Sequence, residues 1–113
     1  MFKEGSGDWT QYRRLPSAIE IDFHDSEYGR GEVPYWVAMN QVYDRAFEAL
    51  KCAYEDGIRY VIFTHGASMS RPGKTTARSE VRALMRSKEA TPFVCRRDCI
   101  QHNSVFVAAI RRK

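Results

Sequence analysis

The order of hydrophobic patterns predicts an α/β domain of the βαβαββ type, in which two helices pack on a four-stranded mixed sheet. Residues 17–25 alternate apolar and polar side chains, which is typical of a strand with one solvated face. Apolar residues recur every three or four positions over 34–56, which predicts a helix. The continuous apolar run at 60–63 predicts a strand covered on both faces. Strand, helix and strand in this order favour a parallel pair with a right-handed crossover.

The helix predicted over 34–56 begins and ends with residues that suit those positions. Pro34 fits a first helical turn, and Gly57 fits the position just past the end. An aromatic-rich stripe defines the apolar face, and we interpret this stripe as core. Its members are Trp36, Met39, Tyr43, Phe47, Leu50 and Tyr54.

The second half of the chain predicts one more helix and a closing pair of strands. The helix is expected over 76–88, and the strands over 92–97 and 104–111 with a turn at 101–103. Both helices are expected to contact the sheet through Phe47, Leu50, Val81 and Leu84.

The N-terminal segment, residues 1–16, is polar and is predicted to form a loosely packed arm ahead of a domain spanning 17–113. It carries acidic residues and has no apolar stretch, so we expect no secretory signal. Nothing in the chain approaches the run of about 18 apolar residues that a membrane span requires. Three cysteines do not make a disulfide framework, which favours a reducing compartment. We therefore expect a cytoplasmic protein with no membrane partner.

Charge is distributed unevenly along the chain. Residues 1–57 carry 6 Lys/Arg against 11 Asp/Glu, whereas residues 58–113 carry 12 Lys/Arg against 3 Asp/Glu. A domain polarised in this way projects a positive potential from one region, which favours polyanions. The sequence thus predicts nucleic acid as the partner, with DNA and RNA both open and the oligomeric state undetermined.

Three titratable residues follow or close the two predicted parallel strands. His24 closes the first strand, two positions after Asp22, and His65 closes the second. Ligands of open α/β sheets gather outside the carboxyl ends of the strands, so we expect all three side chains at one edge. An acid and two imidazoles there could act as general acid and base, or hold a divalent cation such as Mg²⁺ or Mn²⁺. No other cofactor is expected.

The loop after His65 has the features of an anion-binding site. It leaves a buried strand and opens a helix, so its amide groups and the helix N-terminus would face an anion. Gly73-Lys74-Thr75 resembles the end of a nucleotide-binding P-loop, but Ser68 stands where that motif needs a small Gly or Ala. We therefore expect phosphate binding without nucleotide hydrolysis.

Arginines continue this basic character into the second helix. Arg78, Arg82 and Arg86 are spaced by four and share one helix face, with Arg71 and Lys74 just before them. Guanidinium groups suit phosphate oxygens because their donor fork matches them. These five cations, together with Gly66, are the predicted nucleic-acid contacts.

A group of possible metal ligands lies further along, where Cys95, Cys99 and His102 follow one another at short spacings. The group lacks a fourth ligand and matches no common zinc spacing, and strand alternation accounts for both cysteines. We therefore predict no metal site there.

The segments that carry the predicted site resemble the Smr domain, a small domain related to the C-terminus of certain MutS-like proteins. The family's Leu-Asp-Leu-His-Gly strand corresponds to residues 21–25, and its His-Gly-Xaa-Gly turn corresponds to 65–68. The resemblance covers about residues 17–110. It implies a βαβαββ fold, nucleic-acid binding and, in many members, nicking endonuclease activity. It also implies that Asp22 and His24 are catalytic, with His65 and Gly66 in the second motif.

Two other functions remain open at this point. Asp25 and Ser68 stand where the family has glycines, which favours a module that binds nucleic acid without cutting it. The third hypothesis is an enzyme acting on a small anionic metabolite at the edge that holds His24 and His65.

Overall fold

The computed structural model describes residues 2–22, 35–64 and 77–112, which form a mixed α/β fold around one five-stranded sheet. The class of fold is as predicted, but the sheet contains five strands rather than four, in the order β1-β4-β5-β3-β2. The elements are β1 (Lys3–Glu4), the 3-10 helix η1 (Trp9–Arg14), β2 (Ala18–Asp22), α1 (Tyr35–Asp56), β3 (Tyr60–Thr64), α2 (Ala77–Arg86), the 3-10 helix η3 (Arg96–Asp98), β4 (Ile100–Gln101) and β5 (Val105–Ala109).

The predicted pair of parallel, adjacent strands is present. β2 and β3 are parallel neighbours, and their last residues, Asp22 and Thr64, are opposite each other. β5 runs antiparallel on the other side of β3, with Val105 opposite Thr64. The ends of β2 and β3 and the start of β5 therefore lie at one edge of the sheet. We call this edge, defined by Asp22, Thr64 and Val105, the carboxyl edge.

The closing hairpin differs from its prediction. The strand expected over 92–97 is reduced to a single bridge between Val94 and Ile110. β4 comes later and is only two residues long, with η3 between it and the bridge. β4 then pairs antiparallel with β5 across the turn.

Arg96 accounts for this difference, because its side chain holds the segment against the end of α2. Its Nε donates to the Met85 carbonyl at 2.7 Å, and its Nη1 donates to the Thr91 hydroxyl at 2.9 Å. Nη2 donates to the Ser87 carbonyl. Carbonyls at a helix C-terminus lack partners within the helix, and a cation there also complements the helix dipole. This capping keeps the segment beside the helix end instead of in the sheet ladder.

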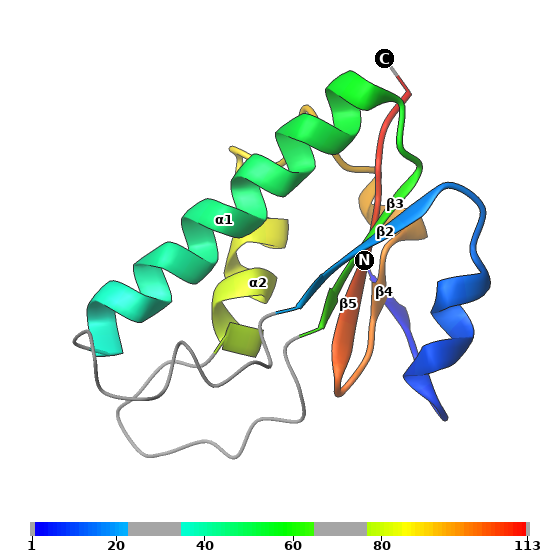
Figure 1. The fold of residues 1–113 in the computed structure, drawn as a ribbon, viewed down its shortest axis with the longest axis horizontal. Coiled ribbons are helices and arrows are strands. Elements are labelled where there is room, and N and C mark those ends of the chain that lie inside the picture. Colours follow the sequence, from blue (N-terminus) through cyan, green and yellow to red (C-terminus); the bar gives the residue numbers. More distant parts are fainter. Residues whose placement is uncertain (1, 23–34, 65–76, 113) are drawn as a thin grey trace.

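Both long helices lie on one face of the sheet (Figure 1). Leu50, Val81 and Leu84 are fully buried as predicted, whereas Phe47 is only half-buried. The side chains at the centre of the buried face of α1 are smaller than those of the predicted aromatic stripe, because α1 packs closely against both α2 and β3. Over residues 40–56 of α1, the fully buried side chains are Val42, Ala46, Leu50 and Ala53.

The N-terminal segment covers the other face of the sheet, where η1, drawn in blue, lies opposite the long helices (Figure 1). Tyr12 of η1 is only 8% exposed and packs with Ile62, Val105 and Val107 in a second apolar cluster. β1 adds a parallel strand beside β4 at the edge of the sheet. The segment is therefore integrated into the fold and is not the loosely packed arm that its polar composition predicts.

His102, in the turn between β4 and β5, ties this segment to the sheet. Its Nδ1 accepts a hydrogen bond from the Ser104 amide at 2.9 Å, which leaves Nε2 to donate to the Gly7 carbonyl at 2.8 Å. The Tyr12 ring packs edge-on against the imidazole, with centroids 6.0 Å apart. Gly5 permits this approach, since a Cβ there would lie 2.5 Å from the Tyr12 hydroxyl.

Candidate functional site

The carboxyl edge holds the one predicted catalytic residue that the structure describes. Asp22 is the last residue of β2, and its backbone is opposite Thr64 at the end of β3. His24 follows Asp22 by two positions and His65 follows Thr64 directly, and both lie outside the described residues. Of the predicted catalytic arrangement, the structure therefore describes one part: β2 and β3 are parallel and end at the same edge of the sheet.

The predicted phosphate contacts divide between the loop and α2. Gly66, Arg71 and Lys74 lie outside the described residues. The three arginines predicted to follow them, Arg78, Arg82 and Arg86, are all within α2.

Arg82 joins α2 to the carboxyl edge. Its Nη2 donates to the His102 carbonyl at 3.3 Å, in the turn that leads into Val105. The side chain is half-buried, so part of its hydrogen-bonding capacity supports the fold. Arg86, one helical turn further along, is exposed and better placed to meet a partner.

Glu20 belongs to this edge as well, although it is not among the predicted site residues. Arg13 donates to its carboxylate from Nε at 2.8 Å and from Nη2 at 3.3 Å, and the buried Thr64 hydroxyl donates to it at 3.4 Å. The hydrogen bond from Arg13 lowers the pKa of Glu20, so the carboxylate is charged at neutral pH. The alternation of β2 contained this signal, since it predicts Glu20 and Asp22 on the same strand face.

The cysteines and the histidine near the closing hairpin serve the fold. His102 uses both ring nitrogens in hydrogen bonds to the backbone. Cys99 is fully buried, and its sulfur lies 3.4 Å from both the Cys95 carbonyl and the Ala109 amide. Within 2–22, 35–64 and 77–112, no group of three or more His, Cys, Asp or Glu could hold a metal ion.

The Cys99 thiol is expected to make stability fall at alkaline pH. Burial raises its pKa from 9.0 to about 11. Because the folded state favours the neutral thiol, its contribution is complete below about pH 9 and is lost as pH rises towards about 11, where the unfolded thiol is already ionised. Denaturant unfolding of wild type and Cys99→Ser over this range should show a steeper loss for wild type. Parallel pH profiles would contradict this assignment.

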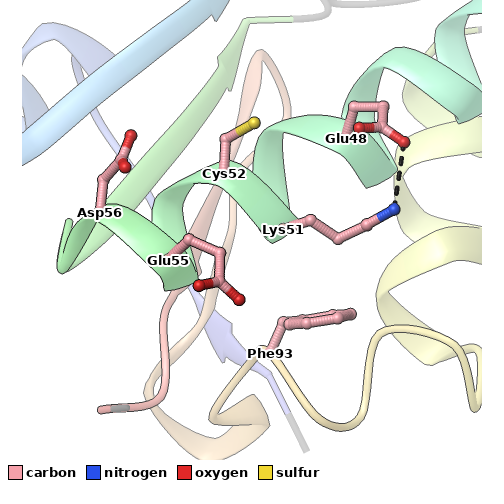
Figure 2. A pocket seen from close by; sticks show the side chains of 6 residues that line it. All are labelled: Glu48, Lys51, Cys52, Glu55, Asp56 and Phe93. Atoms are coloured by element: carbon pink, nitrogen blue, oxygen red, sulfur yellow. Dashed lines mark hydrogen bonds and ion pairs between the residues drawn. The ribbon is translucent and has the colours of Figure 1, made fainter.

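One open cavity of about 330 Å³ lies along the outer side of α1 (Figure 2). Its lining residues are Glu48, Lys51, Cys52, Glu55, Asp56 and Phe93. Figure 2 shows the Lys51 amine turned towards the Glu48 carboxylate, 3.3 Å away. Carboxylates outnumber the single amine in this lining, so the cavity repels phosphate and does not suit an anionic metabolite.

The arrangement as a whole defines a class of protein, a mixed α/β domain whose parallel strand pair ends beside an arginine-bearing helix. Comparison of the chain with protein-family models, with curated proteins and with solved structures gave no match. Neither long helix, over its described residues, is long and apolar enough to cross a membrane.

Proposed function

We propose that this protein binds nucleic acid at the carboxyl edge and along α2, and that it hydrolyses phosphodiester bonds there. The observation that supports this most directly is the register of the parallel pair, which ends β2 and β3 together at Asp22 and Thr64. α2 lies at the same edge because Arg82 is hydrogen-bonded to the hairpin turn. The ends of β2 and β3 thus lie near an arginine-bearing helix, at the edge where an open sheet usually presents its ligands.

The proposed chemistry divides its tasks among three residues near the strand ends. His24 and His65 are the general acid and base, since imidazole changes protonation near neutral pH. Asp22 orients one imidazole or helps to hold a Mg²⁺ or Mn²⁺ ion. Phosphate is held by the loop residues Gly66, Arg71 and Lys74 and by the arginines of α2, whose charge offsets that of the non-bridging oxygens.

This proposal places the chain with the Smr domains, as a divergent, cytoplasmic member. The alternative within the same class is a module that binds nucleic acid without cutting it. A wild-type protein that binds labelled single- and double-stranded DNA or RNA, yet leaves every substrate intact with Mg²⁺ or Mn²⁺ present, would favour that alternative.

Binding through α2 should be strongly salt-dependent. Arg86 is the cleanest position to test, because its side chain is exposed and it lies on the proposed surface. Each phosphate contact contributes a log–log slope of about −0.9 on duplex DNA, or about −0.7 on a single strand. Arg86→Gln should therefore make the slope shallower by about that amount, measured by fluorescence anisotropy between about 50 and 200 mM salt.

Lys51→Gln provides the matched control, since it removes one exposed cation from the acidic cavity on α1. The log–log salt slope of Lys51→Gln should equal that of wild type. Salt-insensitive binding, or equal changes in both variants, would count against a phosphate-binding surface on α2.

A further inference from the structure

A second basic site lies at the opposite end of the sheet from the carboxyl edge. A cavity of about 350 Å³ opens there, lined by Arg59, Cys95, Asp98, Ile110, Arg111 and Arg112. Arg59 directly precedes β3, and the two other arginines follow the end of β5. Because Tyr60 is opposite Ala109 in the ladder, the segments carrying these arginines are neighbours in space. We call this cavity the arginine cavity.

Little negative charge balances these three guanidinium groups. Asp98 is the one carboxylate among the lining residues, and it already lies 3.9 Å from the Lys3 amine and accepts from the Cys95 thiol at 3.3 Å. Arg59 and Arg112 are exposed, and their side chains make no hydrogen bond or ion pair with any residue the structure describes. Like charges gathered in this way disfavour the empty site and favour an anion.

The backbone holds the arginines of the cavity in place. The Arg59 amide donates to the Ser17 carbonyl at 3.0 Å, and the Arg59 carbonyl accepts from the Ile110 amide at 2.8 Å. The Arg111 amide donates to the Phe93 carbonyl at 2.8 Å, and the Arg111 Nε donates to the Thr91 carbonyl at 2.9 Å. The cavity is thus built on rigid strand ends, which reduces the entropy cost of binding.

We propose that the arginine cavity binds a backbone phosphate of the nucleic acid, as a second contact separate from the carboxyl edge. Guanidinium is the group best suited to phosphate oxygens, and the cavity is large enough to admit one. Five-residue strands separate the two ends of the sheet by roughly 17 Å, close to five base-pair steps of duplex. One duplex of moderate length can therefore contact both sites. The polynucleotide assignment rests on the proposed function, whereas binding of phosphate by the cavity does not.

The double variant Arg59→Gln/Arg112→Gln tests this proposal on the full chain. Binding of a labelled duplex of about 12 base pairs, measured by anisotropy, should weaken by about tenfold or more, and the salt slope should become shallower by about 0.9 for the one lost phosphate contact. Arg45→Gln/Lys51→Gln removes the same charge from exposed positions on α1 and should change neither quantity. Thermal unfolding of the Arg59→Gln/Arg112→Gln variant should match that of wild type, because neither of these two guanidinium groups bonds to a described residue.

Titration with inorganic phosphate, followed by NMR of the backbone amides at 59 and 110–112, separates this proposal from the preceding one. If the double variant binds the duplex as its control does, the polynucleotide assignment is wrong. Phosphate-induced shifts in that case would assign the cavity to a free phosphate group. If duplex binding depends on Arg86 but not on the cavity, only the second contact fails. If no duplex binds but phosphate shifts these amides, the proposed function fails and the cavity remains an anion site.

Discussion

Replacing Asp22 or His65 with alanine is expected to reduce the rate of phosphodiester cleavage by about 10² to 10⁴. Each replacement removes a group that moves or orients a proton in the transition state, and the backbone of β2 and β3 should keep the register of the edge. Affinity should change by less than about threefold, because neither residue is assigned to hold phosphate. Single-turnover cleavage and anisotropy on the same labelled substrate, with Mg²⁺ or Mn²⁺ present, measure the two effects separately.

Arg86→Gln is the matched comparison, since it should weaken binding while leaving the cleavage rate of bound substrate near that of wild type. Cleavage that continues undiminished in both alanine variants would place the active site elsewhere. A parallel loss of cleavage and affinity would show that Asp22 or His65 contributes to binding rather than to chemistry.

Tyr12→Ala should lower the free energy of unfolding by about 3 kcal/mol, a value typical of removing a large buried aromatic side chain. Tyr12 is 8% exposed and packs against Ile62, Val105 and Val107, so its loss uncovers one face of the sheet. Its hydroxyl and ring also lie close to Gly5 and His102, which connect the N-terminal segment to the hairpin turn. Urea unfolding followed by circular dichroism measures the change.

Arg14→Ala controls for the position, because Arg14 is exposed in the same 3-10 helix. Its effect should remain within about 0.5 kcal/mol. Equal and small effects of the two replacements would mean that the N-terminal segment is the loosely packed arm that its composition predicts, and that the sheet is stable without it.

The spacing of apolar residues in the N-terminal segment carried a signal for its packing. Trp9, Tyr12 and Leu15 recur every three residues, which is the period of a 3-10 helix, and all three belong to the cluster on the second face of the sheet. Three positions in a polar segment are too few to separate this pattern from chance. The continuous apolar run of β3 did indicate that something must cover both faces, but it did not indicate which segment.

The arginines illustrate a second limit. Spacing by four correctly placed Arg78, Arg82 and Arg86 on one helix, yet Arg82 donates to the His102 carbonyl and Arg96 caps that helix. A guanidinium has the same composition whether it faces solvent or a backbone carbonyl, so only its neighbours in space assign its role. The sequence did not predict the arginine cavity either, because Arg59 and Arg112 are 53 positions apart in the chain.

The β2-α1-β3 unit followed from local periodicity, because alternation and helical spacing depend on which side chains a single element must bury. The parallel pairing of β2 and β3 followed from the strand–helix–strand order, whereas the register that sets Asp22 opposite Thr64 came from the tertiary structure. Three other features depended instead on contacts between distant segments. These are the segment that covers the second face of the sheet, the two-residue length of β4 and the small side chains at the centre of α1. Such contacts leave little trace in any one stretch of sequence, since each is decided by what packs against it.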